Sequence, residues 1–368
     1  MIRRARYRVA VIGHTGRGNY GHDVDTVWLE LPECEIVGVA DADEGGLSQA
    51  VGRLRAPRGF RDYREMLDKL RPDIAAIGPR WLDQHRDMIV AAAEHGCHVF
   101  MEKPFCRTLD EADQIVAACE RNRVKLAIAH QTRYSPKLKA VRDMIGEGAI
   151  GDVLELRARG KEDARGGGED LWVLGSHLFN LIHVIGGEPK WCFADVRVDG
   201  RTAGPGDVRE GNEGIGPLVG DSVQAMYGLA RGAVAYFGSR KNANGGRFGL
   251  QVYGSKGVIE ILTGHLPAAH FLADPAWSPG RTGANWIPIS SMGPGREEPL
   301  ADGGLRAGNV IACRDLLAAI EGDRLPECNV YEARATIEMI LAVFASHRAR
   351  APVPIPLAPR GNPLADWR

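Results

Sequence analysis

The sequence predicts a two-domain α/β protein, in which a domain with a parallel sheet precedes an α+β domain with a large, mostly antiparallel sheet. At 368 residues the chain exceeds the size at which one hydrophobic core keeps growing. Up to about Ala129, short β-branched runs alternate with helical patterns, as they do in βαβ units. Beyond Tyr134 the pattern changes to short strands separated by glycine-rich turns. We therefore expect domains at residues 1–130 and 131–368.

Composition limits the classes of partner. The 46 basic and 47 acidic residues give a net charge of -1, so neither nucleic acid nor an anionic membrane is an expected partner. The seven cysteines form no Cys-x-x-Cys pair, which favours a reducing cytoplasm over a disulfide scaffold, and we expect no bound metal. No stretch approaches the roughly 20 apolar residues of a membrane span, so we expect a soluble protein.

The first domain is expected to contain five strands, at residues 8–12, 35–40, 74–77, 97–101 and 124–129. Apolar residues at helical spacing predict a helix over about 20–31, after the loop that follows the first strand, and another over 88–93. Thr108 and Glu111 form a capping-box pattern for a helix that runs to about Arg121.

The second domain is expected to begin with a helix over 136–145, a strand over 153–161 and one helix over 172–185. Four short strands follow at 223–229, 233–237, 248–253 and 258–262, and the Gly- and Pro-rich stretches 199–220 and 268–304 are interpreted as long loops. Two helices, 310–321 and 331–347, close this domain.

The first strand leads directly into a glycine-rich loop, Gly13-His14-Thr15-Gly16-Arg17-Gly18. A strand, a glycine turn and a helix form the Rossmann dinucleotide site, in which the start of the helix faces the pyrophosphate. Gly13 and Gly18 occupy the first and third positions of that pattern, but Thr15 replaces the second glycine. The Thr15 hydroxyl could compensate by donating to a phosphate oxygen, and Gly16 lets the loop relax.

Asp41 ends the second strand, 23 residues after Gly18. A carboxylate there can accept both ribose hydroxyls of NAD and repels the 2′-phosphate of NADP, which favours NAD. The alternative is an acidic turn residue without a ligand. Arg17 could instead stack on adenine or meet a 2′-phosphate, which keeps NADP as the less favoured cofactor.

Several motifs together resemble the Gfo/Idh/MocA oxidoreductases. They are the glycine loop, Asp41, the Gly78-Pro79 turn followed by His85, Glu102-Lys103-Pro104, and Arg133-Tyr134-Ser135-Pro136. The resemblance implies NAD or NADP as cofactor and hydride transfer at a carbinol carbon of a sugar, cyclitol or sugar derivative. It also implies a homodimer or homotetramer, cofactor contacts from Pro79, His85, Glu102 and Gln131, and a substrate contact from Arg133.

In this family scheme Lys103 lies beside the nicotinamide and the substrate hydroxyl. Lysine can take the alcohol proton where burial or a neighbouring charge lowers its pKa; the alternative is a solvated lysine in a turn. The resemblance implies that His177 is the second proton-transfer residue, because it matches the histidine of the family's catalytic Asp-x-x-x-His helix, but Val173 stands where the aspartate is expected. Either His177 acts without a carboxylate, or Asp170 serves from a different angle. Asn180, three residues after His177, is a further substrate-binding candidate.

Arg157, Arg159 and Lys161 alternate on one face of a strand. Arg159 and Lys161 could bind a carboxylated or phosphorylated sugar, but a solvated sheet face or a subunit interface explains the pattern equally well.

Two other functions fit the same motifs. One is a glycosidase or lyase that retains its NAD and uses transient oxidation to allow elimination. The other is a dinucleotide sensor without catalysis, which the presence of both Lys103 and His177 disfavours.

Overall fold

A computed structural model describes residues 7–243 and 245–367. The chain forms two compact units. The first contains the chain up to His130 together with residues 213–215 and 305–334, and the second contains Gln131–Asn212, Gly216–Gly304 and the chain from Ala335 onward.

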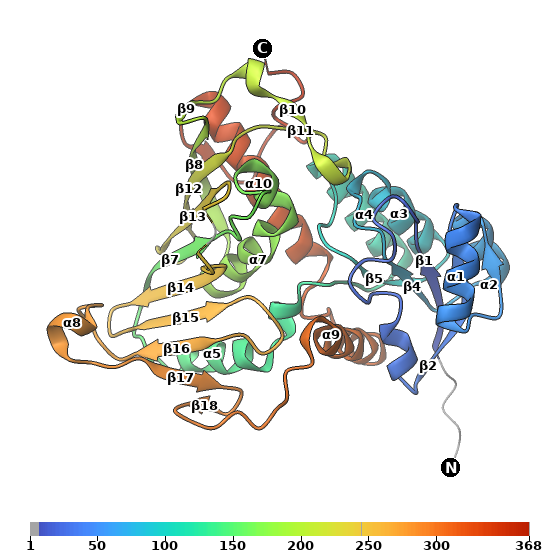
Figure 1. The fold of residues 1–368 in the computed structure, drawn as a ribbon, viewed down its shortest axis with the longest axis horizontal. Helices are drawn as coiled ribbons and strands as arrows, with labels where there is room; N and C mark the ends of the chain where they lie inside the picture. Colours follow the sequence, from blue (N-terminus) through green and yellow to red (C-terminus); the bar gives the residue numbers. More distant parts are fainter. Residues whose placement is uncertain (1–6, 244, 368) are drawn as a thin grey trace. The chain divides into compact units, whose positions relative to one another are not determined.

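The first unit is built on a six-stranded parallel sheet in the order β3-β2-β1-β4-β5-β6, as expected for a Rossmann fold (Figure 1). Its strands are β1 (Tyr7–Ile12), β2 (Cys34–Ala40), β3 (Gly59–Phe60), β4 (Ile74–Ile77), β5 (His98–Met101) and β6 (Leu126–Ile128). The strand order reverses between β1 and β4, and ligands of such sheets bind outside the carboxyl ends of the strands at this point. The ends of β1, β2, β4 and β5 therefore define where a dinucleotide site is expected.

Four α-helices connect these strands: α1 (Glu44–Leu54), α2 (Tyr63–Leu70), α3 (His85–Glu94) and α4 (Leu109–Asn122). The predicted cap of α4 is present, because the Thr108 side chain accepts a hydrogen bond from the Glu111 amide at 3.2 Å. The Glu111 carboxylate reaches one residue further back than a capping box requires and accepts from the Arg107 amide at 2.8 Å.

The prediction of a helix over residues 20–31 is wrong. The chain forms turns there, followed by a short 3-10 helix, η1 (Val27–Glu30). Asn19 and Asp23 have φ values of +53° and +60°, which no α-helix contains. The apolar residues of this segment are nevertheless buried. The spacing of the apolar residues correctly predicted which side chains are buried. The backbone nevertheless forms turns, because Asn19 and Asp23 adopt left-handed conformations.

The second unit is built on an 11-stranded sheet, and among its described strand pairs only β7–β13 is parallel. Along the sheet the order is β18-β17-β16-β15-β14-β7-β13-β12-β8-β19, with β9 beside β8. The strands are β7 (Val153–Arg159), β8 (Pro189–Val198), β9 (Arg201–Thr202), β12 (Ser222–Leu229), β13 (Val234–Arg240), β14 (Gly249–Gly254), β15 (Val258–Leu262), β16 (Ala269–Leu272), β17 (Ile287–Ser290), β18 (Gly293–Pro294) and β19 (Val353–Pro354). The short pair β10 (Arg209–Glu210) and β11 (Pro217–Leu218) forms a separate ribbon. Strand β8 was not predicted, and the predicted loop 268–304 contains β16 to β18.

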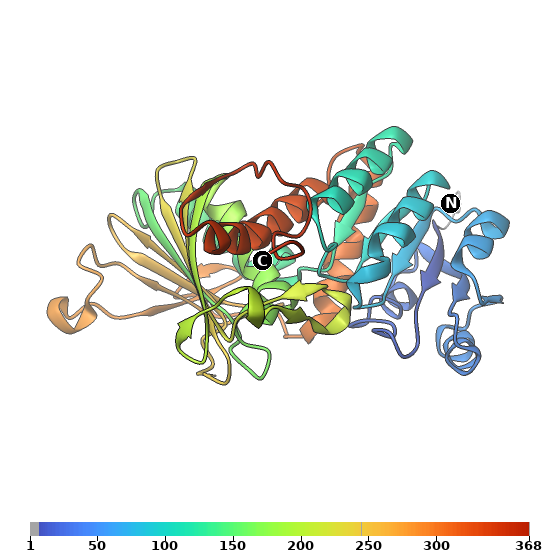
Figure 2. The ribbon, with the colours of Figure 1, turned by 90° about the horizontal axis from the view of Figure 1, so that it is seen from above.

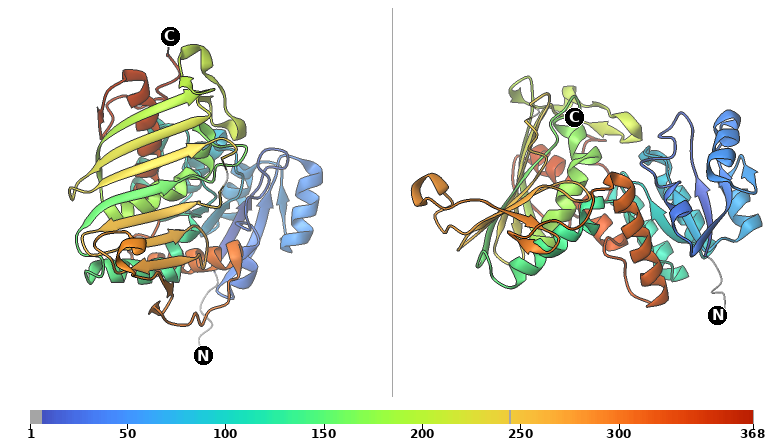
Figure 3. Two further views of the ribbon diagram at one scale, coloured as in Figure 1. Left: turned by 60° about the vertical axis from the view of Figure 1, so that its left-hand side comes forward. Right: turned by 60° about the horizontal axis from the view of Figure 1, so that its bottom comes forward.

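Helices cover one face of this sheet and leave the other open, as the face-on view of the strands shows (Figure 3). The helices of this part of the chain are α5 (Pro136–Gly146), α6 (Gly168–Val173), α7 (Gly175–Gly186), the short α8 (Pro279–Thr282) and α10 (Val330–Ala349). Phe179 of α7 packs against Phe237 and Tyr227 of the sheet, with ring centroids 4.8 and 5.8 Å apart. Helix α10 runs beneath the same strands (Figure 2), where its Met339 carbonyl accepts from the Tyr227 hydroxyl at 2.8 Å.

Two predictions about helices require correction. The single helix expected over 172–185 is two helices, because Leu174, with φ -126° and ψ -38°, interrupts it. The helix predicted at 310–321 is present as α9 (Gly304–Glu321), but it packs within the first unit and not the second. The physical reason is contact with the segment before β2: Asn309 Nδ2 donates to the His22 carbonyl at 2.7 Å, and Arg306 pairs with Glu30.

Within residues 7–243 and 245–367, no helix is both long and apolar enough to cross a bilayer. Over the same part of the chain, no group of three or more His, Cys, Asp or Glu side chains is arranged to hold a metal ion. All seven cysteines are buried free thiols.

Candidate active site

The glycine loop leaves β1 and turns back on itself. The Gly13 amide donates to the Ala40 carbonyl at 2.9 Å, which ties the loop to the end of β2. Gly16 has a φ of +82° and faces open space, since no atom lies within 4 Å of where a Cβ would stand. Gly18, with a φ of +88°, packs so closely on the Arg80 and Trp81 backbone that any side chain would collide. The left-handed φ favours glycine at both positions, close packing excludes a side chain at Gly18, and Gly16 lies on the exposed side of the loop.

Asp41 lies where predicted, but its carboxylate is bound by the chain itself. Oδ1 accepts from the amides of Thr15 (3.1 Å) and Asp43 (3.0 Å), and Oδ2 accepts from the hydroxyls of Thr15 (2.7 Å) and Tyr20 (2.8 Å). Burial alone would raise the pKa of Asp41, but these hydrogen bonds together outweigh it and hold the pKa below its ordinary value. The expectation that the Thr15 hydroxyl faces a phosphate is corrected, because that hydroxyl faces Asp41.

Two cationic side chains near the loop also have partners within the protein. The Arg17 guanidinium pairs with Asp83 and lies over the Trp81 ring, 4.5 Å from its centroid. Arg53 lies over the Tyr20 ring at 4.6 Å and pairs with Asp25 at 2.8 Å. Arg17 therefore has protein partners for both its charge and its flat face, which argues against its predicted role at adenine or a 2′-phosphate.

The turn after β5 carries Glu102 and Lys103, and it is fixed by His85. Nδ1 of the fully buried His85 ring lies 2.9 Å from the Pro104 carbonyl, and Nε2 lies 2.7 Å from the Pro79 carbonyl. His85 thus joins the turns that follow β4 and β5, so the geometry favours a positioning role over the cofactor contact expected of it. Lys103 is 7% exposed and precedes a cis proline.

Glu102 is fully buried. Its Oε1 lies 2.5 Å from Nδ1 of His22, a residue of the glycine-loop segment that the sequence analysis did not identify. Its Oε2 has no hydrogen-bond partner among the described residues. A buried carboxylate oxygen without a donor is costly, which is consistent with a ligand that supplies one.

A cavity of about 290 Å³ lies at the carboxyl ends of β1 and β2. The lining includes the loop residues Gly13 and His14, the strand end at Asp41 and Ala42, and Arg61. Together with the open side of Gly16 and the unpartnered oxygen of Glu102, this cavity fits a dinucleotide bound across the switch point of the sheet.

In the second unit, His177 and Asn180 lie one turn apart on α7 and are both buried. The His177 ring meets the Phe248 ring edge to face, with centroids 6.3 Å apart. Helix α7 also packs on the 3-10 helix η3 (Gln131–Tyr134), which carries the predicted residues Gln131 and Arg133. The structure therefore brings the substrate candidates of α7 and η3 into one region.

Asp170 is separated from His177 by the break at Leu174. Its Oδ2 accepts from the Ser239 hydroxyl at 2.5 Å and from the Glu162 amide at 3.3 Å, so this carboxylate ties α6 to the turn after β7. Burial raises the pKa of Asp170. Because Val173 ends α6, an aspartate there would not share a continuous helix with His177. These contacts favour a structural role for Asp170.

Arg159 lies on the face of the sheet opposite to α7, the helix that carries His177. Leu156 of β7 contacts α7 at Gly186. Successive side chains of a strand point to opposite faces of the sheet, so Arg159, three residues after Leu156, points to the open face. There it pairs with Glu162 at 2.8 Å. Lys161 is exposed, and its Nζ lies 3.8 Å from Asp163. We therefore leave both residues out of the proposed substrate site.

His265 was missed by the sequence analysis. It lies in the loop after β15, where the neighbouring Gly264 amide donates to Thr132 Oγ1 of η3 at 2.9 Å. The side chain is 6% exposed, and its Nδ1 has no hydrogen-bond partner in the described part of the chain. No local pattern identifies it, because only the packing of this loop on η3 brings it near that helix.

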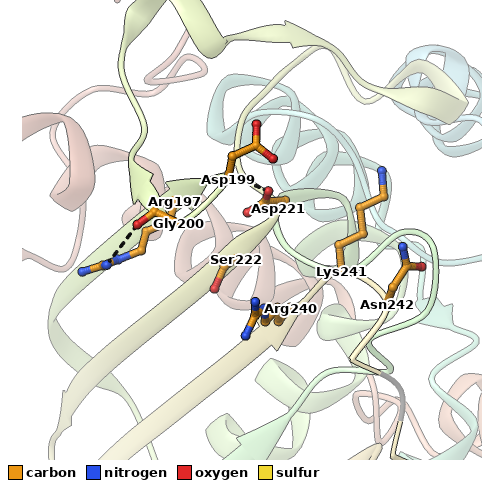
Figure 4. Close-up of a pocket in the computed structure, with 8 residues that line it drawn as sticks. All are labelled: Arg197, Asp199, Gly200, Asp221, Ser222, Arg240, Lys241 and Asn242. Atoms are coloured by element: carbon orange, nitrogen blue, oxygen red, sulfur yellow. Dashed lines mark hydrogen bonds between the residues drawn. The ribbon is translucent and has the colours of Figure 1, made fainter.

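A cavity of about 470 Å³ on the second unit does not belong to this site (Figure 4). Arg197 reaches back to the Gly200 carbonyl, and the Asp199 amide donates to Asp221 at 2.8 Å. None of the predicted site residues lines this cavity.

The chain matches two family models in succession. Residues 7–130 match the model described as "Oxidoreductase family, NAD-binding Rossmann fold", and residues 138–260 match the "GFO/IDH/MocA C-terminal domain". The chain belongs to the Gfo/Idh/MocA family. The predicted fold class, the family resemblance and NAD as the cofactor are thereby confirmed.

Curated members of this family resemble parts of the chain. A D-apiose dehydrogenase of Paraburkholderia graminis is 34% identical over 149 residues, which are 40% of this chain and 38% of that protein. A levoglucosan dehydrogenase of Pseudarthrobacter phenanthrenivorans is 26% identical over 250 residues, or 60% of this chain and 63% of that protein. The matches thus span less than two thirds of these relatives.

A solved structure of levoglucosan dehydrogenase in complex with NADH and levoglucosan has the same fold. It is 19% identical with a TM-score of 0.77, and the alignment covers 96% of this chain and 100% of that one.

Proposed function

We propose that this Gfo/Idh/MocA protein is an NAD-dependent dehydrogenase that oxidises a carbinol carbon of a sugar, cyclitol or sugar derivative. The observation that carries the proposal is the buried Glu102-Lys103 turn at the carboxyl end of β5, next to the switch point of an NAD-binding Rossmann sheet. Sugar dehydrogenases among the curated relatives support the substrate class.

In the proposed reaction the alcohol loses a hydride from carbon and a proton from oxygen, and a carbonyl is formed. NAD, when bound, supplies the hydride acceptor. Lys103 Nζ takes the hydroxyl proton as general base. His177 is the second proton-transfer residue, and Asn180 and Arg133 bind hydroxyls of the substrate. Glu102 holds the cofactor through its buried Oε2.

The test is NADH formation by the full-length protein with NAD and a panel of sugars, anhydrosugars and cyclitols. Lys103→Ala is expected to lower kcat/KM by about 10²–10⁴-fold, the usual contribution of a general base. Lys69→Ala is the matched control, because Lys69 is exposed on α2 and pairs with Glu65 one turn away. An undiminished rate in Lys103→Ala would contradict the assigned role.

The same assay separates the alternatives. Bond cleavage with NAD retained and no net NADH would identify an elimination cycle. Tight NADH binding without turnover of any compound in the panel would identify a sensor.

A further inference from the structure

The carboxylate of Glu102 is held by the segment that follows the glycine loop. It is fully buried, and its Oε1 accepts a hydrogen bond from Nδ1 of His22 at 2.5 Å. In the described part of the chain no second side chain donates to this carboxylate. The His22 side chain is 35% exposed, so the contact joins a buried acid to a residue at the surface of the same unit.

The backbone of this segment packs directly on the Glu102 side chain. Gly21 has a φ of +68°, and a Cβ there would stand 2.5 Å from the Gly78 carbonyl oxygen and 3.2 Å from Cγ of Glu102. Both the conformation and the close packing exclude a side chain at this position. The chain therefore passes against Glu102 at Gly21 and presents the next residue, His22, to the carboxylate.

Helix α9 holds the backbone of His22. Nδ2 of the fully buried Asn309 donates to the His22 carbonyl at 2.7 Å. Asn309 lies 287 residues further along the chain but belongs to the same compact unit. The position of His22 is thus fixed on two sides, by Glu102 through its ring and by Asn309 through its carbonyl.

The contact with His22 determines which oxygen of Glu102 is left for a ligand. The terminal torsion of a glutamate is soft, so a carboxylate without a fixed partner rotates easily. A donor on Oε1 fixes the plane of the carboxylate and leaves Oε2, which is buried and has no hydrogen-bond partner among the described residues. A ligand that donates to Oε2 removes the cost of this unsatisfied oxygen.

We propose that His22 is a positioning residue that acts through Glu102. Its hydrogen bond to Oε1 fixes the carboxylate so that Oε2 accepts from a ribose hydroxyl or the carboxamide of the bound dinucleotide. This inference rests on the proposed dinucleotide-dependent function, and it gives a role in cofactor binding to a side chain outside the glycine loop and the Glu102-Lys103 turn.

The first arm of the test measures the Kd of NADH by fluorescence titration of the full-length protein. His22→Ala is expected to raise this Kd by about tenfold or more, because the carboxylate loses the donor that fixes it. His22→Asn keeps an N–H donor close to the position of Nδ1 and should bring the Kd back to within about threefold of the wild type.

His270→Ala is the matched control. His270 Nδ1 also lies beside a glutamate, 3.8 Å from Oε1 of Glu260, but this pair is partly exposed on β15 and β16 of the second unit. Its loss should leave the Kd of NADH within about twofold of the wild type.

The second arm is a double-mutant cycle with Glu102. Glu102→Ala should itself raise the Kd of NADH. Adding His22→Ala to that variant should change the Kd by less than about twofold, since a residue that acts through Glu102 has no effect in its absence. General damage to the fold by His22→Ala would instead persist in the Glu102→Ala background.

The outcomes distinguish the inference from the proposed function. An unchanged Kd in His22→Ala, no recovery in His22→Asn, or additive effects of His22→Ala and Glu102→Ala would each overturn the inference alone. Failure of the wild type to bind NADH would overturn the proposed function with it.

Discussion

At the scale of single residues, two buried aspartates show how neighbours set the behaviour of one side-chain type. Asp41 receives four donors, which outweigh burial and lower its pKa. For Asp170, burial outweighs the donors Ser239 and Glu162 and raises the pKa. The two carboxylates therefore contribute opposite slopes to the dependence of stability on pH.

The direction of the pKa shift of Asp170 predicts how the stability of the protein changes with pH. A carboxyl with a raised pKa in the folded state contributes stability below its unfolded pKa and loses it as pH rises through its folded pKa. Asp170→Asn removes this titration, so the free energy of unfolding of the variant should rise relative to the wild type from about pH 4 upward. Urea unfolding of both proteins at acidic and neutral pH measures the difference, and a difference that falls with pH would contradict the assignment.

At the scale of elements, the position of the substrate-binding candidates on α7 depends on how this helix packs on the sheet. Phe179 is fully buried between Phe237 and Tyr227, and it lies on the same helix as His177 and Asn180. Its packing therefore fixes the helix that carries the substrate candidates.

Phe179→Ala should lower the free energy of unfolding by about 3–5 kcal/mol, because it leaves a cavity beneath the sheet. Phe193→Ala is the control: this ring is 41% exposed on β8, and its loss should cost less than about 1 kcal/mol. Denaturant unfolding compares the two, and equal losses would show that α7 is not anchored by Phe179.

The glycine loop shows the limit of sequence patterns at this scale. The strand at 74–77 and the cap at Thr108 were predicted because each depends on a few adjacent residues. The helix after the loop was mispredicted because Asn19 and Asp23 take left-handed conformations that hydrophobic spacing does not encode.

At the scale of the whole molecule, the chain returns to its first unit after it has built most of the second. Helix α9 meets the segment before β2 at two points about one turn apart, through Arg306 and Asn309. A segment more than 170 residues beyond His130 therefore completes the core of the dinucleotide-binding unit.

Leu316→Ala tests this arrangement. Leu316 is fully buried in α9, so its truncation should cost about 2–5 kcal/mol. Hydrogen exchange should accelerate in β1 and β2 and remain unchanged in β12 and β13, while Phe179→Ala should give the reverse pattern. Acceleration in β12 and β13 by Leu316→Ala would contradict the assignment of α9 to the first unit.

The sequence by itself determined the parallel sheet of the first unit, the glycine loop and the Glu102-Lys103 turn, because each is encoded by neighbouring residues with a fixed spacing. Only the tertiary structure decided what Asp41 binds, on which sheet face Arg159 lies, which unit α9 joins and that His265 lies beside η3. These depend on contacts between residues far apart in the chain, such as Tyr20 with Asp41 and His22 with Asn309, for which local spacing carries no information.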